Sequence, residues 1–296
     1  MSSPHGFLIV DKPSGVTSFA MVALVRRLTG VRRVGHAGTL DPLASGVLPV
    51  AVGQATRFIE YLDDAPKAYV ARVRFGWATD TYDADGQPTG HGDPSRLDAA
   101  AVAGALPAFA GDIEQTPPAF SAIKIAGKPL YRYAREGAAV AAPPRTVRID
   151  RIVLRSFEPP VAEIAVTCGK GTYIRSLAHD LGRRLGCPAH LAALQRTATG
   201  GFAISDAHAP SHLEAAARDA RLPDLLLAVD RAVERRPAAI LGPARCADVR
   251  AGRNVVLPPR DRAQLCRAYS SEGDFLGVLR CREGGGWHPE KVLGAA

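Results

Sequence analysis

The sequence predicts an α+β protein: a mixed, mainly antiparallel sheet flanked by helices, with a small β-barrel at the C-terminal end. Residues 67–77 alternate apolar and polar side chains, as a strand with one buried face does. Residues 145–157 and 161–168 are strand-like and are joined by a Glu-Pro-Pro turn, which indicates a hairpin. Residues 238–296 combine glycines, turn residues and short apolar runs, a pattern typical of a small barrel.

The length of the chain predicts two domains. With 296 residues it exceeds the usual size of one domain, so a large domain and a smaller one are expected. We place the boundary at an Arg-Arg-Pro sequence, which gives domains of residues 1–236 and 237–296. Apolar residues make up 47% of the chain and charged residues 22%, as in ordinary soluble proteins.

Charge and cysteine usage narrow the class of function. The net charge of +8, from 37 Lys and Arg against 29 Asp and Glu, favours a polyanionic partner. The five cysteines form no C-x-x-C pair, which argues against a disulfide framework or a zinc site. With no signal-like N-terminus and no apolar run of about 18 residues, we expect a cytoplasmic protein that does not enter a membrane.

The remaining elements follow from apolar spacing and end signals. Strands are expected at residues 7–10 and 47–52. Five helices are expected, and their start and stop signals set the bounds. The first helix begins at Thr17 or Ser18 and ends before Gly30, and the second covers residues 54–62. The third covers residues 95–110, with Ser95 and Asp98 as its cap. The fourth covers residues 174–185, and the fifth covers residues 211–229 despite Pro223.

The acidic segment at residues 80–86 superficially resembles a calcium-binding loop. An EF-hand loop carries glutamate at its twelfth position, where this chain has His91. We therefore predict a turn here and no metal site. The sequence also holds no phosphate-binding P-loop and no dinucleotide fingerprint, so no cofactor is expected.

The most unusual stretch of the chain is residues 35–48. It places three glycines, one proline and a single carboxylate, that of Asp41, within fourteen residues. Glycine allows tight turns and close approach of the backbone to a ligand, and the proline after Asp41 restricts that residue to extended conformations. A rigid loop presenting Asp41 is expected, although an Asp-Pro pair alone is more often an ordinary turn.

The string Gly-His-Ala-Gly-Thr-Leu-Asp-Pro within this stretch resembles the signature of the TruB family of tRNA uridine-55 pseudouridine synthases. The resemblance implies the pseudouridine synthase fold and a C-terminal PUA-like domain. It makes Asp41 the catalytic aspartate and His36 a residue that helps to hold the substrate RNA open. The Lys-Pro pair at Lys12 also matches a family motif, and we assign Lys12 to substrate binding in a supporting role.

A second string, Gly-Thr-Tyr-Ile-Arg-Ser at residues 171–176, resembles another motif of the family. By that resemblance Arg175 pairs with Asp41, and Tyr173 lines the base pocket. Leu194 matches the pocket leucine beneath the uracil, and Tyr69 matches the tyrosine that stacks on the base. Periodicity alone makes Tyr69 a core residue, while a phenol can also serve as an acid or base.

Residues 115–137 form a long connection in which cations alternate with aromatic residues. Such a composition suits contacts with phosphates and bases, although a solvated loop is the simpler alternative. In the family the matching insertion is a thumb loop that clamps the T-arm of tRNA. We therefore assign Lys124, Lys128 and Arg132 to substrate binding.

The resemblance predicts a monomeric enzyme that converts uridine 55 in the T-loop of tRNA to pseudouridine with Asp41. Isomerisation needs no redox partner or energy source. Two other functions remain open: a tRNA-folding chaperone without obligatory catalysis, and a carboxylate-based glycosidase. Glycosidases normally use two carboxylates that flank the bond, and no second acid accompanies Asp41 in its motif.

Overall fold

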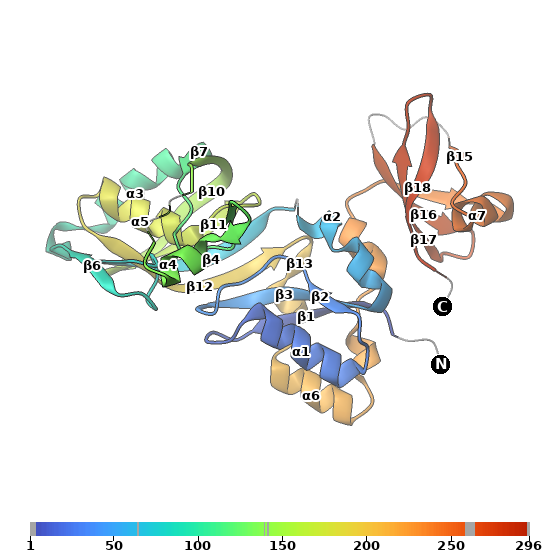
Figure 1. The fold of residues 1–296 in the computed structure, drawn as a ribbon, viewed down its shortest axis with the longest axis horizontal. Coiled ribbons are helices and arrows are strands. Elements are labelled where there is room, and N and C mark those ends of the chain that lie inside the picture. The colour runs from blue at the N-terminus through green and yellow to red at the C-terminus, as the bar shows by residue number, and fades with distance from the viewer. Residues whose placement is uncertain (1–3, 64, 139, 141, 258–263, 295–296) are drawn as a thin grey trace.

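The structure is a computed structural model that describes residues 4–63, 65–138, 140, 142–257 and 264–294. It has two lobes, each built on its own main sheet (Figure 1). The larger lobe holds a nine-stranded sheet with helices packed against it, and the smaller one holds the last five strands. This arrangement confirms the predicted α+β class with a small C-terminal β unit.

The large sheet is antiparallel except at one place. Its order is β1 (Gly6–Lys12), β3 (Ala44–Val52), β12 (Ala189–Thr199), β4 (Lys67–Phe75), β11 (Val161–Cys168), β10 (Arg145–Glu158) and β7 (Gly111–Gln115), with β2 (Val34–His36) on β3 and β13 (Phe202–Ala203) on β12. The exception is the pairing of β3 with β12, which is parallel and joins residues 44–46 to 194–196. This short seam divides the sheet into an N-terminal half and a central half.

Helices cover each half. Helices α1 (Ser18–Thr29) and α6 (Pro210–Arg218) pack together beside β1, whereas α3 (Ala99–Ala105) and α5 (Ile174–Arg184) pack on β10 and β12 (Figure 1). Thr17 caps α1 by accepting a hydrogen bond from the amide of Ala20, and Gly30 ends it with φ +68°. The structure thus confirms the predicted helix α1, and of the two predicted cap residues it is Thr17 that caps the helix.

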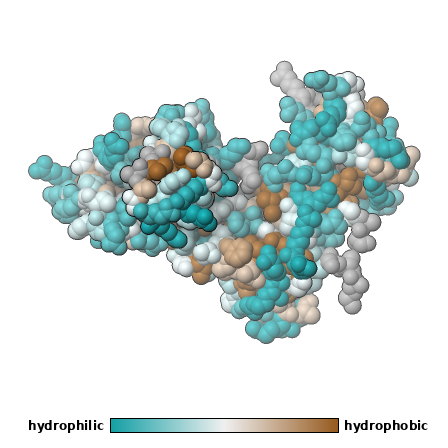
Figure 2. Space-filling view, viewed as in Figure 1, coloured by the Kyte–Doolittle hydropathy of each residue, from teal (hydrophilic) through white to brown (hydrophobic). Residues whose placement is uncertain are grey.

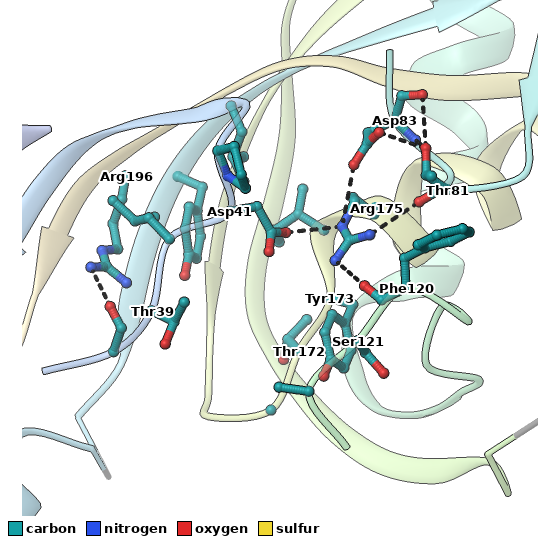
Figure 3. A pocket seen from close by; sticks show the side chains of 18 of the residues that line it. Thr39, Asp41, Thr81, Asp83, Phe120, Ser121, Thr172, Tyr173, Arg175 and Arg196 are labelled. Carbon is teal, nitrogen blue, oxygen red and sulfur yellow. Dashed lines mark hydrogen bonds and ion pairs between the residues drawn. The ribbon is translucent and has the colours of Figure 1, made fainter. Parts of the chain in front are cut away.

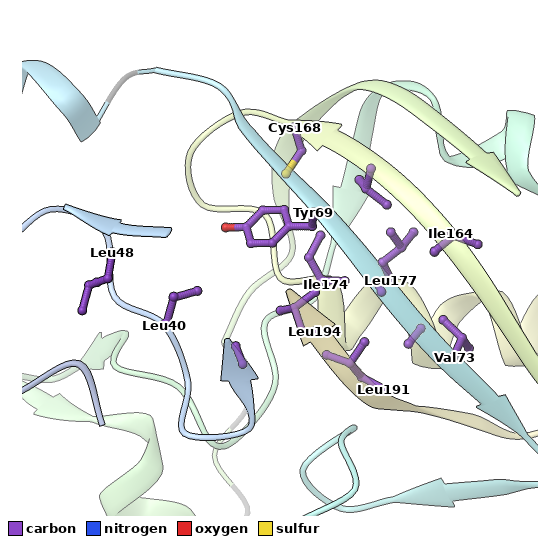
Figure 4. Close-up of a cluster of buried hydrophobic side chains, with 14 of the residues drawn as sticks. Leu40, Leu48, Tyr69, Val73, Ile164, Cys168, Ile174, Leu177, Leu191 and Leu194 are labelled. Atoms are coloured by element: carbon purple, nitrogen blue, oxygen red, sulfur yellow. The ribbon is translucent and has the colours of Figure 1, made fainter. Parts of the chain in front are cut away.

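The alternating strand β4 forms the middle of the core. Tyr69, Ala71, Val73 and Phe75 are all buried, as their spacing predicts, and pack among apolar side chains of the neighbouring strands (Figure 4). The prediction was wrong for Trp77, which is 44% exposed. Gly76 adopts φ +100° after β4, so the alternation is broken before β5 (Trp77–Thr79), which pairs with β6 (Pro88–His91) instead.

Three predicted helices are shorter or tighter than expected. Residues 53–58 form a 3-10 helix before α2 (Glu60–Asp63), and α3 gives way to a 3-10 turn at residues 106–109, which contains a proline. The helix expected over residues 211–229 ends at 218. Ala220 takes φ +56° just after it, and Pro223 then begins a separate 3-10 turn, because proline cannot continue a helix.

The C-terminal lobe is a curled sheet in the order β14 (Ala238–Leu241), β16 (Leu265–Ser270), β17 (Phe275–Cys281), β18 (Gly286–Val292) and β15 (Val255–Val256), with α7 (Pro243–Arg250) packed against it. It docks on residues 53–63 of the large lobe. The Tyr61 hydroxyl donates to Glu290 at 3.0 Å, and the Phe58 and Phe275 rings lie 5.7 Å apart. Hydrophilic residues cover most of the visible face of both lobes (Figure 2).

Candidate active site

A cavity of about 730 Å³ opens where the two halves of the large sheet meet. Four parts of the chain that are distant in sequence line it: the loop at residues 38–42, the turn at 81–85, the segment at 120–122 and the start of α5 at 170–175. Side chains from β4, β12, the start of β10 and α4 (Leu130–Arg135) complete the lining. The cavity therefore gathers both of the motifs that sequence analysis selected.

Asp41 lies on the loop between β2 and β3. Beneath the loop, the Ser18 hydroxyl accepts a hydrogen bond from the Leu40 amide at 2.9 Å and donates one to the Leu40 carbonyl at 3.0 Å. Gly38 adopts φ +68°, a conformation that favours glycine. The loop thus holds the Asp41 carboxylate, whose side chain is 44% exposed, at the cavity wall.

Arg175 pairs with Asp41 as predicted. Its Nε atom lies 2.9 Å from Oδ2 of Asp41, although the N–H does not point at the oxygen well enough for an aligned hydrogen bond. Nη1 donates to the Thr81 carbonyl at 3.2 Å, and Nη2 donates to the Phe120 carbonyl at 3.0 Å (Figure 3). These contacts fix a guanidinium that is 6% exposed, in the first turn of α5 where the helix dipole disfavours a cation.

Asp83 is a second carboxylate on Arg175, and sequence analysis missed it. Its Oδ2 lies 3.6 Å from Arg175 Nε, while its Oδ1 accepts hydrogen bonds from the Thr81 hydroxyl at 2.6 Å and the Asp85 amide at 3.1 Å. The turn that carries Asp83 is held to α5 by the stacked rings of Tyr82 and His179, whose centroids are 4.0 Å apart. The acidic composition of residues 80–86 was one signal in the sequence for this role.

Tyr69, Tyr173 and Leu194 all line the cavity, as predicted. Gln115 clamps the backbone of Tyr173 by accepting from its amide at 2.7 Å and donating to its carbonyl at 3.0 Å. The Arg145 guanidinium lies 4.9 Å from the centre of the Tyr173 ring. Burial raises the pKa of Tyr69, so its phenol is protonated at neutral pH.

Arg196 is a further residue that sequence analysis did not select. It lines the cavity from β12 and is completely buried. Nε donates to the Val47 carbonyl at 2.8 Å and Nη2 to the Gly38 carbonyl at 2.9 Å, so Arg196 ties together the two ends of the Asp41 loop. An arginine within a strand pattern gives no hint of such partners, which only the fold brings together.

Lys12 does not lie in the cavity, so the assignment of direct substrate contact was wrong. Its side chain is completely buried, and its ammonium group donates to the carbonyls of Pro13, Val16 and Pro42 at 2.9, 2.7 and 3.3 Å. Pro42 follows Asp41 directly. Lys12 therefore supports the Asp41 loop from within the protein, which agrees with the supporting part of its predicted role.

We expect Lys12 to make stability depend on pH. Burial lowers the pKa of Lys12 from 10.5 to about 8. Between these values the unfolded chain binds more protons than the folded one, so the contribution of Lys12 to the free energy of unfolding rises with pH, by roughly 3 kcal/mol over the full window. Urea unfolding of wild type and Lys12→Met at about pH 7.5 and 9.5 measures this rise. Equal changes in both proteins would contradict it.

Four other predicted residues do not line the cavity. His36 lies half-buried at the end of β2, two residues before the loop that lines the cavity. Lys124, on β8 (Lys124–Ile125), and Arg132, on α4 (Leu130–Arg135), are exposed on the outer side of the predicted insertion. Lys128, on β9 (Lys128–Pro129), forms an ion pair with Glu136. The same insertion instead supplies Phe120, Ser121, Ala122, Tyr131 and Arg135 to the lining.

The lining of the cavity is rich in positive charge. Its cations outnumber its carboxylates two to one and comprise Lys67, Arg135, Arg145, Lys170, Arg175 and Arg196, against Asp41, Asp83 and Asp85. Such a lining favours a polyanionic ligand. Within the described part of the chain, no group of three or more His, Cys, Asp or Glu side chains is arranged to hold a metal ion.

Two family models match consecutive parts of the chain. Residues 26–174 match the TruB family pseudouridylate synthase N-terminal domain, and residues 175–234 match the tRNA pseudouridylate synthase B C-terminal domain. The first match contains Asp41 and the second begins at Arg175, so the two members of the ion pair come from different family segments. The chain is thus an enzyme of the pseudouridylate synthase class, an isomerase.

Full-length relatives agree with this class. A protein named tRNA pseudouridine synthase B from Dehalococcoides mccartyi is 41% identical over 98% of this chain and 96% of its own length. Another of that name from Thiobacillus denitrificans is 44% identical over 94% of this chain and 93% of its own. The chain belongs to the TruB family.

Solved structures show the same fold. A structure of an H/ACA ribonucleoprotein bound to a substrate RNA containing 2′-deoxyuridine matches with a TM-score of 0.75 and 24% identity, over 98% of this chain and 85% of the other. A Cbf5-Nop10-Gar1 complex matches with a TM-score of 0.72 and 26% identity, over 98% and 82%. None of the helices in the described ranges has the length and apolar character needed to span a membrane.

Proposed function

We propose that this protein isomerises uridine 55 in the T-loop of tRNA to pseudouridine, acting as a monomer. The observation that carries the proposal is the Asp41–Arg175 pair at the wall of a nucleotide-sized cavity with a cationic lining. The names of the full-length relatives, tRNA pseudouridine synthase B, support tRNA as the substrate.

The reaction breaks the bond between C1′ and N1, turns the uracil and forms a bond between C1′ and C5. Asp41 is the group that acts on the sugar or the base, because its carboxylate is both accessible and held by Arg175. Tyr69 and Leu194 provide the apolar surface that keeps the detached uracil in place. The Tyr69 oxygen is the group that removes the proton from C5.

The uridine has to leave the T-loop stack before it can reach Asp41. Flipping a base out costs a few kcal/mol, which phosphate contacts by the protein must offset. Arg135, Arg145 and Lys170 lie at the cavity and are suited to that task, more so than the outward-facing Lys124, Lys128 and Arg132. His36 remains our candidate for contact with the displaced part of the loop.

The two alternative functions make different use of this site. A chaperone needs the cationic surface but not the buried ion pair. A glycosidase needs a second carboxylate that donates a proton, and Asp83 is close enough to raise the question. Oδ1 of Asp83 accepts from Thr81 and Asp85, and Oδ2 is ion-paired with Arg175 at 3.6 Å, which suits a fixed anion and not a proton donor.

Release of tritium from a T-arm stem-loop labelled at C5 of uridine tests the proposal. Isomerisation replaces the C5–H bond with a C5–C1′ bond and releases the label, whereas chaperoning and sugar hydrolysis leave C5 untouched. We expect stoichiometric release with the wild-type protein. A stem-loop with cytidine at the target position is the matched control and should release no label. Binding without release would contradict the proposed function.

A further inference from the structure

One nitrogen of the Arg196 guanidinium, Nη1, has no evident part in holding the Asp41 loop. Nε and Nη2 hold the Val47 and Gly38 carbonyls, on either side of Asp41. Nη1 is buried and has no well-aligned hydrogen bond among the described residues, although the Arg196 guanidinium is within interaction range of the Tyr69 hydroxyl. A buried donor without an acceptor costs about 1–3 kcal/mol, so its retention in the wall of an active site calls for an explanation.

The surroundings of Nη1 point to Tyr69. Arg196 on β12 lies directly opposite Tyr69 on the antiparallel neighbour β4, so their side chains share one face of the sheet. Both residues line the cavity. Burial raises the pKa of the Tyr69 phenol, and the neighbouring Arg196 guanidinium opposes that effect.

The backbone leaves room for this arrangement. Gly38, in the Asp41 loop, passes so near to Arg196 that an added Cβ atom would lie 3.2 Å from Nη1. Gly46 passes even closer, since a Cβ atom there would lie 2.2 Å from the Arg196 carbonyl oxygen. The loop thus approaches both the guanidinium and the backbone of Arg196 closely.

We infer that Arg196 is a positioning residue that holds the Asp41 loop with two nitrogens and stabilises the ionised Tyr69 oxygen with the third, Nη1. The inference rests on the proposed function, in which Tyr69 removes the C5 proton. In that step the C5–H bond breaks and its electron pair forms the C5=C6 bond. The N1=C6 pair moves onto N1, which takes up the proton that the Tyr69 phenol gives up on ionising, and the C5 proton then restores the phenol.

If Arg196 has this role, loss of Nη1 should slow one step of the reaction, the removal of the C5 proton. Tyr69 has to be ionised to accept the proton, and a buried phenolate next to no cation is strongly disfavoured. Without Arg196, deprotonation at C5 becomes slower than the steps at the sugar. Substrate binding is unaffected, because Nη1 is not accessible to the RNA.

The test compares Arg196→Met and Arg196→Lys with Gln195→Met, a matched control at the exposed neighbouring position on β12. Turnover of T-arm RNA by both Arg196 variants should fall about 10- to 100-fold, with KM within about threefold of wild type. Deuterium at C5 of the target uridine should slow the Arg196 variants more than wild type. The control should match wild type in all three respects.

A double-mutant cycle separates the role at Tyr69 from mere support of the loop. In a Tyr69→Phe background, Arg196→Lys should cost much less than it does in wild type, because the two losses share one step. If Arg196→Met does not fold, Arg196→Lys is used instead, with a fluorinated tyrosine at position 69. The fluorinated tyrosine is more acidic than tyrosine, so it should recover part of the lost rate.

Three results would overturn the inference: an unchanged isotope effect, equal losses in both backgrounds, or no recovery with the acidic tyrosine. Each would leave Arg196 as a purely structural residue. These results differ from failure of the proposed function, in which the wild-type protein itself releases no tritium from the labelled T-arm.

Discussion

Asp41→Asn is expected to abolish pseudouridine formation while leaving RNA binding intact. The change keeps the size of the side chain but removes its charge, and with it the group that acts on the sugar or base. Loss of such a group lowers turnover by about 10⁴-fold or more. Tritium release from the labelled T-arm measures turnover, and a filter-binding titration of the same RNA measures affinity.

The geometry at Asp41 makes this variant a clean test. The carboxylate is 44% exposed, and after the change the buried Arg175 keeps Asp83 and two backbone carbonyls as partners, so the melting temperature should stay within a few degrees of wild type. Ser14→Ala is a suitable control, because the Ser14 hydroxyl bonds to the Leu43 carbonyl in the same loop but lies outside the cavity lining. Measurable turnover by Asp41→Asn would refute the assignment.

Arg175→Met should have the second largest effect, and it should act on two properties at once. Turnover is expected to fall about 10³-fold, since Asp41 loses its ion-pair partner and its fixed orientation. The free energy of unfolding is expected to fall by about 3 kcal/mol, because Asp83, whose side chain is only 9% exposed, is left without a cation. Urea unfolding and single-turnover assays measure the two losses separately.

The double variant Arg175→Met, Asp83→Asn distinguishes catalysis from stability. Asparagine at position 83 removes the stranded charge and keeps an oxygen for the Thr81 hydroxyl and the Asp85 amide. Much of the lost stability should therefore return, while turnover stays low. Recovery of turnover along with stability would show that Arg175 acts only by holding the site together.

The sequence predicted the central strands and the existence of the Asp41–Arg175 ion pair well. β4 and the β10–β11 hairpin follow from local patterns, because alternation and turn residues report on local geometry. The pairing of Asp41 with Arg175 was available only through resemblance to a family, since 134 positions of chain separate the two residues (175 less 41) and no local pattern brings them together.

The residues that sequence analysis missed share one property. Asp83 and Arg196 work through partners on other elements: Arg175 for the first, and the carbonyls of Gly38 and Val47 for the second. Lys12 was misplaced for the same reason, because a lysine before a Pro-Ser-Gly turn normally faces solvent. The helix expected to reach residue 229 failed where Pro223 outweighed the apolar spacing.

The parallel contact between β3 and β12 has a consequence for how this enzyme loses activity. Asp41 belongs to the sheet half on one side of that three-pair seam, and Arg175 belongs to the other half. A slight opening at the seam separates the carboxylate from the guanidinium while the strand pairings within each half are kept. Inactivation under mild denaturation should therefore precede the cooperative loss of secondary structure, so that turnover is a more sensitive gauge of the native state than circular dichroism.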